Sequence, residues 1–428
     1  MESIPMKQNC SAGEIRESLE QMGSMAKAAA RKLAVAAPED KNRWLTAMAD
    51  AVDADAELIM RANQTDMENA KAAGLSPAML DRLRLDEKRI KGISDGLRHV
   101  VTLPDPVGRR LDSIRRPNGL DIEKVSVPIG VIAIIYEARP NVTVDATGLC
   151  LKAGNAVILR GGSEAIHSNL ALAKSISDAG VKAGMPEGTI QMIPWTGHDA
   201  VSLMLKMNQY IDLVIPRGGE RLIRAVVEQA TMPVIKHYKG VCHIFVDADC
   251  DLDRACDIIE NAKCQRPGVC NALETLLIHK DILNRFAPML AKRLANVEFH
   301  ADDAFRALVP QALPATEDDW YREYLDLKLA VRTVGSLDEA IAHINQYGSG
   351  HSDCILTTDD AHAEQFLNEV DSATVYANAS TRFTDGGEFG FGAEIGISTD
   401  KLHARGPMGL VELTSYKYKV RGSGQIRA

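Results

Sequence analysis

Gly-Val-Ile-Ala-Ile-Ile-Tyr-Glu at residues 130–137 and Asn-Ala-Val-Ile-Leu-Arg at residues 155–160 are short apolar runs of strand length. Similar runs recur as far as Asp249, and segments with helical spacing separate several of them. The predicted strands are 130–137, 155–160, 189–193, 211–215, 234–235 and 243–247, and predicted helices between them include 166–180 and 220–229. Strands rich in Val and Ile that alternate with helices indicate a parallel sheet covered on both faces.

A second alternating stretch runs from Cys250 to about Thr358. Its predicted strands are 274–278, 329–334 and 353–356, and its predicted helices are 252–262, 282–295 and 337–344. A chain of 428 residues exceeds what one core usually supports, so two or three domains are expected. The last part of the chain combines strand with Gly-rich loop, including residues 386–396 and 406–409.

The N-terminal part, up to about residue 100, is predicted to be helical. Ser11 and Glu14 form a capping box before an Ala-rich helix, and Pro38 is suited to the first turn of the next helix. That second helix is predicted to continue until Gly74. Further on, residues 111–114 and 120–127 flank a Pro-Asn-Gly turn and predict a hairpin, either an arm for a partner subunit or an ordinary surface hairpin.

The composition is that of a globular protein, with 46% hydrophobic and 25% charged residues and a formal net charge of −9. This balance argues against a general nucleic-acid binder. No apolar run reaches the length of a membrane span, and the first residues, with Glu2, Glu14 and Glu17, predict no signal peptide. The cytoplasm is therefore the expected compartment.

Cysteine usage argues against a disulfide framework and against a structural metal site. The spacing contains no C-x-x-C pair and no H-E-x-x-H, and most cysteines are expected to be reduced and buried. The eight cysteines are Cys10, Cys150, Cys242, Cys250, Cys256, Cys264, Cys270 and Cys354.

Cys270 is the candidate nucleophile. It follows a Pro-Gly turn at residues 267–268 and precedes an apolar run at 276–278, so a loop anchored in a buried sheet would present its thiol. A thiol held in this way can serve as a nucleophile. The alternative is one more small buried residue, which is what most free cysteines are.

Two strand-to-helix turns have the composition of phosphate sites. Arg160-Gly161-Gly162-Ser163 and Arg217-Gly218-Gly219-Glu220 each follow a strand and open a helix, where backbone N–H groups attract anions. An arginine beside each turn adds a bidentate partner. Neither G-x-G-x-x-G nor G-x-x-x-x-G-K-[ST] occurs, so the ordinary dinucleotide fingerprint and the P-loop do not apply.

Longer motifs carry a resemblance to a known family. The segments 128–131 and 153–157 and the Cys270 loop resemble the aldehyde dehydrogenase superfamily. Within it, the chain from about Gly23 onward resembles the gamma-glutamyl phosphate reductases. The motifs are Tyr-Glu-Ala-Arg-Pro-Asn-Val at 136–142, Ile-Leu-Arg-Gly-Gly at 158–162, Ile-Pro-Arg-Gly-Gly at 215–219, Asn-Ala-Ser-Thr-Arg-Phe-Thr-Asp-Gly-Gly at 378–387 and Leu-His-Ala-Arg-Gly-Pro-Met-Gly at 402–409.

The resemblance implies an α/β fold of two Rossmann-like parallel-sheet domains with a small β oligomerisation extension. Residues 1–112 and 129–240 would form the nucleotide-binding domain, and residues 241–375 the catalytic domain with the cysteine. Residues 113–128 and 376–428 would form the extension, so a homo-oligomer is expected.

The resemblance also implies a reaction: reduction of L-glutamyl 5-phosphate with NADPH to L-glutamate 5-semialdehyde and phosphate, in proline biosynthesis. Cys270 would attack the acyl carbon and form a thioester. Asn141 matches the superfamily asparagine that donates to the developing oxyanion, and the backbone N–H of Cys270 would be the second donor. From the residues alone, a turn residue after Pro140 is the preferred interpretation of Asn141.

Cofactor residues follow from the same resemblance. Arg160 and Gly161 would bind the adenosine ribose, and Ser163 replaces a glutamate common in NAD-preferring members, which favours NADP. Arg217, Gly218 and Gly219 match the pyrophosphate turn, and Glu323 aligns with a glutamate on the nicotinamide ribose. A solvated charge is the alternative for Glu323.

Basic residues are needed for the phosphate and α-carboxylate of the substrate. The candidates from matching motifs are Arg266, Arg139, Arg382 and His403, each of which could instead be a structural ion-pair partner. A glutamate 5-kinase that hands over the labile acyl phosphate is a candidate partner. The segment 235–240, Ile-Lys-His-Tyr-Lys-Gly, lacks the acid with which hydrolytic relatives activate water.

Two other functions stay open from the sequence. A coenzyme-A-dependent acylating aldehyde dehydrogenase also needs no water-activating base. A non-catalytic binding or structural protein of the same fold is the third interpretation, although Cys270 and both Gly-rich turns are intact.

Overall fold

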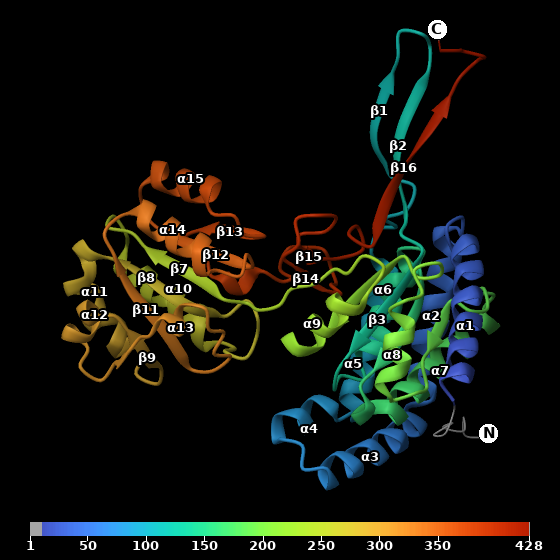
Figure 1. The fold of residues 1–428 in the computed structure, drawn as a ribbon, viewed down its shortest axis with the longest axis horizontal. Helices are drawn as coiled ribbons and strands as arrows, with labels where there is room; N and C mark the ends of the chain where they lie inside the picture. Colours follow the sequence, from blue (N-terminus) through green and yellow to red (C-terminus); the bar gives the residue numbers. More distant parts are fainter. Residues whose placement is uncertain (1–10, 428) are drawn as a thin grey trace. The chain divides into compact units, whose positions relative to one another are not determined.

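The computed structural model describes residues 11–427 of the chain, and the predictions for Glu2 and Cys10 lie outside the described residues. The chain, traced in Figure 1, divides into two compact units. The first contains the described chain up to Lys236, Phe391–Gly396 and the segment from Met408 onward. The second contains His237–Gly390 and Ile397–Pro407.

The first unit begins with helices, as predicted. Ser11 and Glu14 form the capping box of α1, and Pro38 is the first residue of α2. The helices of this unit are α1 (Ala12–Leu33), α2 (Pro38–Ala54), α3 (Ala56–Ala72), α4 (Pro77–Leu83), α5 (Glu87–Thr102), α6 (Val142–Lys152), the short 3₁₀ helix η1 (Ser163–Ala165), α7 (Ile166–Lys182), α8 (His198–Met204) and α9 (Glu220–Gln229).

The single helix predicted from Pro38 to Gly74 is wrong, because the structure has two helices there. Asp55 interrupts them: its backbone lies at φ −92° and ψ 11°, and it serves as the C-cap of α2 and the N-cap of α3. The side chain of Asp55 makes no capping hydrogen bond to α3, so the break lies in the non-helical backbone of this one residue.

A four-stranded parallel sheet forms the core of the first unit, in the order β5-β4-β3-β6. Residues 131–135 of the central strand β3 are completely buried, so this strand reads as a continuous apolar run. The strands are β3 (Val131–Tyr136), β4 (Ala156–Gly161), β5 (Ile190–Met192) and β6 (Leu213–Arg217).

Two strand predictions in this unit need correction. The strand predicted at 211–215 is β6, shifted to Leu213–Arg217. The strand predicted at 234–235 is only an isolated bridge between Val214 and Val234. Pro233, which has no backbone N–H to donate, precedes that bridge and limits the pairing.

The second unit is built on a seven-stranded parallel sheet in the order β10-β9-β11-β8-β7-β12-β13. Its strands are β7 (Cys242–Val246), β8 (Leu273–His279), β9 (Glu298–Ala301), β10 (Leu313–Pro314), β11 (Lys328–Val334), β12 (Ser352–Leu356) and β13 (Thr374–Ala377). Its helices are α10 (Leu252–Cys264), α11 (Lys280–Arg293), α12 (Asp303–Leu308), α13 (Glu317–Trp320), α14 (Leu337–Tyr347), α15 (Asp360–Glu369) and the 3₁₀ helix η2 (Thr381–Phe383). Two parallel-sheet units confirm the predicted α/β fold class.

The predicted hairpin is present as β1 (Arg110–Arg115) and β2 (Asp121–Pro128), joined through Gly119 at φ +88°. Figure 1 shows β16 (Thr414–Arg421), from the end of the chain, beside β2, where it completes a three-stranded antiparallel sheet. Two short strands, β14 (Gly396–Ser398) and β15 (Gly406–Met408), pair separately. Within residues 11–427, no helix has both the length and the apolar character to span a membrane.

A buried ion pair fastens the segment between α10 and β8. Lys263, in the last turn of α10, donates to Glu274, the second residue of β8, at 2.8 Å, and both side chains are completely buried. Burial raises the pKa of Glu274, and the charge of Lys263 opposes that shift. Glu274 also accepts the backbone N–H of Leu325 at 3.1 Å. One carboxylate therefore holds two loops.

Lys263→Met should destabilise the protein by about 3–5 kcal/mol, because it leaves the Glu274 carboxylate buried without its cation. Urea denaturation followed by circular dichroism measures the loss. The matched control is Lys174→Met, which breaks an exposed pair with Asp178 at the same 2.8 Å and should cost at most about 0.5 kcal/mol. Equal losses in the two variants would contradict the role given to burial.

Candidate active site

The Cys270 loop, residues 265–272, joins the end of α10 to the start of β8. Cys270 is half-buried. It precedes β8, so it lies at the amino edge of the parallel sheet of the second unit. Because the strands are parallel, the residues that precede β7 and β12 lie at the same edge. Gly240 and His351 are among them.

Gly240 packs directly on the backbone of Cys270. A methyl carbon added at Gly240 would lie 1.8 Å from the Cys270 carbonyl oxygen, a distance that no side chain can occupy. The N–H of Gly240 donates to Glu323 Oε1 at 2.8 Å. Glu323 is thus half-buried and hydrogen-bonded beside the Cys270 loop, and is more than a solvated charge.

Cys242, at the start of β7, contacts the backbone of the Cys270 loop. Its Sγ donates to the carbonyl oxygen of Cys270 at 3.2 Å. Burial raises the pKa of Cys242 well above its usual value, so this sulfur remains a protonated donor. The sequence offered no signal for this role, because a small buried cysteine in a strand looks the same whether or not it supports a loop.

Arg382 connects the two ends of the Cys270 loop. Its Nε donates to Gln265 Oε1 at 3.0 Å, and its Nη1 donates to Asn271 Oδ1. Burial lowers the pKa of Arg382, as does the nearby charge of Arg266, whereas an interaction with Cys270 raises it. The structure therefore places Arg382 on the loop that carries Arg266 and Cys270, and a guanidinium near a thiol suits a nucleophile.

A chain of buried polar groups continues behind the loop. His351 Nδ1 lies 2.8 Å from Ser352 Oγ, which lies 2.7 Å from Thr384 Oγ1. Burial lowers the pKa of His351 to about 3, so the imidazole is neutral near pH 7. Sequence reasoning missed these residues, since they stand apart in the chain and meet only through strand register.

His403 lies in the segment 397–407, in the left-handed region at φ +67°. Lys401 and Arg405, on either side of it, both pair with Asp371, which follows α15. These contacts fasten the segment that carries His403 near the start of β13.

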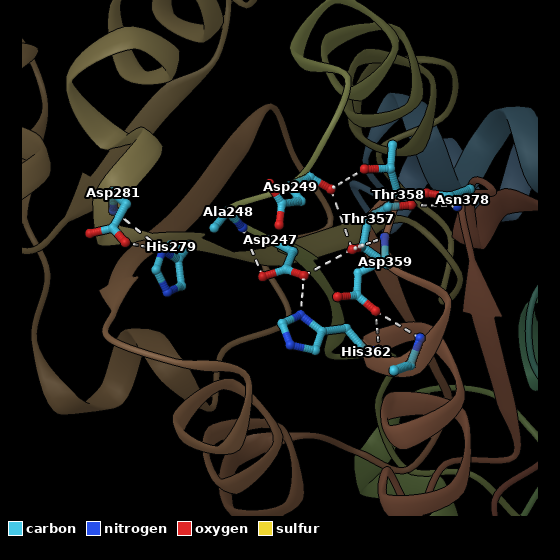
Figure 2. Close-up of polar contacts among 11 residues, drawn as sticks. Asp247, Ala248, Asp249, His279, Asp281, Thr357, Thr358, Asp359, His362 and Asn378 are labelled. Atoms are coloured by element: carbon cyan, nitrogen blue, oxygen red, sulfur yellow. Dashed lines mark hydrogen bonds and ion pairs between the residues drawn. The ribbon is translucent and has the colours of Figure 1, made fainter.

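The opposite edge of this sheet is occupied by its own side chains. Figure 2 shows Asp247, which follows β7, turned toward Thr357, which follows β12, and toward His362 of α15. Asp247 accepts from Thr357 Oγ1 at 2.8 Å and from His362 Nδ1 at 2.6 Å. Among residues 11–427, no group of three or more His, Cys, Asp or Glu is arranged to hold a metal ion. The Asp247 cluster joins strand ends.

In the first unit the candidate residues lie at the carboxyl edge of the sheet. The chain passes from β3 to β4 and β5 on one side and returns to β6 on the other, so the strand order reverses beside β3. Ligands bind at such a point in open α/β sheets. Arg160 and Gly161 end β4, and Arg217 ends β6. The candidates in the segments that follow the strands are Arg139, Asn141, Ser163, Gly218 and Gly219.

The turn after β6 has the form of an anion site, and a carboxylate of the protein already lies there. Gly219 is the N-cap of α9, and its N–H donates to Glu137 Oε2 at 2.9 Å. A methyl carbon at Gly218 would lie 2.4 Å from the same oxygen. An anion is therefore accommodated where the resemblance puts a pyrophosphate.

The turn after β4 holds Arg160 in place. Its Nη2 donates to the carbonyl oxygen of Thr196 at 2.8 Å, and its buried Nε has no partner among the described residues. Burial lowers the pKa of Arg160, which Glu164 and Glu137 oppose. Glu164 Oε1 accepts the N–H of Ala138 at 2.5 Å. An arginine with an unused donor and two glycine turns fit a dinucleotide.

Asn141 is the N-cap residue of α6, but its side chain does not cap the helix. Its Nδ2 donates instead to Asp145 Oδ2 at 2.8 Å, one turn further along α6. An amide has two N–H donors, so one remains for another group. The exposed Arg139 lies just before this helix.

Known proteins resemble this chain in sequence and in fold. The model of the aldehyde dehydrogenase family matches residues 11–309 and 329–404. The chain belongs to this family and is an oxidoreductase that acts on an aldehyde group. Proteins of the family use a nicotinamide cofactor.

Curated relatives narrow the assignment. A gamma-glutamyl phosphate reductase of Clostridium novyi is 57% identical over 406 residues, covering 94% of this chain and 97% of that protein. One of Moorella thermoacetica is 58% identical over 407 residues, covering 95% and 97%. The chain is accordingly a member of the gamma-glutamyl phosphate reductase family within the aldehyde dehydrogenases.

A solved structure agrees in fold over nearly the whole chain. The gamma-glutamyl phosphate reductase of Thermotoga maritima has 47% sequence identity and a TM-score of 0.94, and the match covers 96% of this chain and 100% of that one. An acetylating aldehyde dehydrogenase of Geobacillus thermoglucosidasius shares the fold, with a TM-score of 0.67 at 15% identity.

Gly240→Ala should lower the free energy of unfolding by about 1–3 kcal/mol, because its methyl group overlaps the Cys270 carbonyl and displaces the loop. Urea denaturation measures this change. The control is Gly268→Ala in the Cys270 loop, where the nearest atom would be 3.7 Å away and a change within about 0.5 kcal/mol is expected. An unchanged stability in Gly240→Ala would contradict the described packing.

Proposed function

We propose that the protein reduces L-glutamyl 5-phosphate with NADPH to L-glutamate 5-semialdehyde and phosphate, as a step of proline biosynthesis. The observation that carries this proposal is Cys270, held on a loop beside Arg382 and Arg266 in a chain 57% identical to a gamma-glutamyl phosphate reductase. Cys270 is proposed to be the nucleophile.

The chemistry begins with the Cys270 thiolate attacking the acyl carbon of the acyl phosphate. A carbon–sulfur bond forms, the carbon–oxygen bond to phosphate breaks, and phosphate leaves with its electron pair. Arg266 and Arg382 are proposed to bind the departing phosphate, to which guanidinium groups are well matched. The Asn141 amide and the N–H of Cys270 would stabilise the negative oxygen of the tetrahedral intermediate.

A nicotinamide cofactor supplies the hydride that reduces the thioester. The hemithioacetal that results collapses to the semialdehyde and the Cys270 thiolate. Gly218 and Gly219 are proposed to hold the pyrophosphate, Arg160 and Gly161 the adenosine ribose, and Glu323 the nicotinamide ribose. Ser163 leaves room for a 2′-phosphate without a repelling acid, and the Arg160 guanidinium is proposed to pair with it.

The segment 235–240 contains no Asp or Glu. This supports exchange of the Cys270 thioester with phosphate rather than its hydrolysis by water. Without an acid to activate water, the thioester persists for exchange with phosphate. The same absence suits a coenzyme-A-dependent enzyme, so dependence of turnover on phosphate or on coenzyme A separates the two functions. The roles of Arg139 and His403 in substrate binding belong to the proposal as well.

A homo-oligomer is proposed to form through the β1–β2–β16 sheet. Its outer strand β16 exposes Tyr416, Tyr418 and Val420, which are 51%, 58% and 55% accessible. An edge strand with exposed apolar side chains favours pairing with another chain. A monomer in sedimentation analysis would contradict this.

The cytoplasm as compartment and glutamate 5-kinase as partner remain part of the proposal. Shortening of the transient time in a coupled assay tests the kinase partner.

Cys270→Ala should abolish NADP⁺ reduction by L-glutamate 5-semialdehyde, which in the wild type should require inorganic phosphate, because the thioester is the only route to the acyl phosphate. Absorbance at the NADPH maximum measures both effects. Cys264→Ala, which removes a half-buried thiol from α10, is the control and should keep the activity. Phosphate-independent turnover would point to a hydrolytic dehydrogenase, and turnover in Cys270→Ala would exclude the thioester.

Ser163→Glu should lower kcat/KM for NADPH at least about tenfold and change that for NADH much less, since a carboxylate would face the 2′-phosphate. Initial rates with each cofactor give the ratio. Ser163→Ala removes the hydroxyl without adding charge and serves as the control. Equal losses with both cofactors would show that Ser163 does not set cofactor preference.

A further inference from the structure

A cavity of about 320 Å³ lies in the first unit, where α4, α5 and α6 come together. Its lining consists of Arg82, Arg84, Leu85, Arg89, Gly92, Ile93, Asn141 and Asp145. It differs from the two glycine turns, and of the residues proposed above for the reaction it shares only Asn141. Its volume suits a small molecule.

The arginines of the cavity differ in how their charges are used. Arg89 pairs with Asp81 at 2.8 Å and donates to the carbonyl oxygen of Arg84 at 2.9 Å, so it is committed to the loop between α4 and α5. Arg84 is within 3.6 Å of Asp81 and 3.8 Å of Asp86. Arg82 is exposed and has no ion pair with any residue in the part of the chain described. It is the cation of this cavity that is available to an anion.

Asp145 is the acid of the same cavity. It is an exposed residue on the wall of the cavity, and desolvation by the surrounding protein raises the pKa of its carboxyl to about 6. Its described partner is the amide of Asn141, at 2.8 Å. A carboxylate in such surroundings lacks a cation, and a ligand can supply one.

We propose that this cavity binds the α-amino acid end of the substrate, with Arg82 pairing with the α-carboxylate and Asp145 with the α-ammonium group. The proposal rests on the proposed function, and it names which part of the substrate the first unit recognises.

Asn141 determines which end of the cavity would hold the reacting carbon of the substrate. It lies on the wall together with Asp145, and successive turns of a helix are about 5.4 Å apart. Their side chains are joined by the bond from Asn141 Nδ2 to Asp145 Oδ2 at 2.8 Å, which leaves the second N–H of the amide for the acyl oxygen and the second oxygen of the carboxylate for the α-ammonium group. Asp145 also orients the Asn141 amide, so the group that recognises the amino acid holds the proposed oxyanion donor.

The test compares three aldehydes with phosphate and NADP⁺: L-glutamate 5-semialdehyde, 4-aminobutanal, which lacks the carboxylate, and 5-oxopentanoate, which lacks the ammonium group. Arg82→Met should lower kcat/KM roughly 10- to 100-fold for the two aldehydes with a carboxylate and leave 4-aminobutanal unchanged. Asp145→Asn should lower it more for the two aldehydes with an ammonium group than for 5-oxopentanoate.

Two further variants control the comparison. Arg82→Lys should restore part of the loss, and Arg61→Met, which removes an exposed arginine of α3, should match the wild type. Because Asp145 is exposed, Asp145→Asn should stay within about 0.5 kcal/mol of the wild type near pH 7 in thermal unfolding. A loss of kcat/KM in Arg82→Met that is equal for all three aldehydes would overturn the proposal.

Calorimetry separates this proposal from the proposed function. L-Glutamate should bind the wild type more tightly than 4-aminobutyrate or glutarate, and Arg82→Met should remove the advantage over 4-aminobutyrate. That result would support the cavity even if no aldehyde were oxidised by the wild type, an outcome that would defeat the proposed reaction alone. Equal binding of L-glutamate to wild type and Arg82→Met would overturn the cavity proposal while phosphate-dependent turnover still stood.

Discussion

The buried contact between Lys263 and Glu274 is the constraint on which the arrangement of the Cys270 loop depends. It closes the Cys270 loop at its base, since one partner ends a helix and the other begins a strand. Glu274 also fixes Leu325, and Glu323 reaches from the same loop to Gly240, which lies against Cys270. The fully buried Lys263–Glu274 pair thus helps to fix the position of the half-buried Cys270, through the contacts of Leu325, Glu323 and Gly240.

The candidate site residues lie at opposite edges of the two parallel sheets. In the first unit the glycine turns follow β4 and β6, at the carboxyl edge where the strand order reverses, as the general rule for such sheets expects. In the second unit the corresponding position, after β7 and β12, is filled by the contacts of Asp247 (Figure 2). Its cysteine comes from a helix-to-strand connection, which necessarily ends at the amino edge. A fold of one class therefore offers two kinds of site.

The sequence predicted what depends on local patterns. Apolar runs at 130–137 and 243–247 predicted β3 and β7, Ser11 with Glu14 predicted the start of α1, and motif residues led to the family. Contacts between distant residues had no such signal. The pairing of β16 with β2, the support of Cys270 by Cys242 and the cavity beside Asn141 all depend on tertiary register. The break at Asp55 lies in the backbone of one residue that carries no side-chain cap.

The hydrogen bond from Gly219 to Glu137 affects how the turn after β6 could take up the proposed cofactor. The N–H that a pyrophosphate would use is already satisfied by an anion of the same chain, so the turn is preorganised and its donor is never left bare. The same carboxylate is then an intramolecular competitor. Any dinucleotide that takes this N–H exchanges one anion for another, and its affinity is reduced by whatever free energy the Glu137 contact contributes.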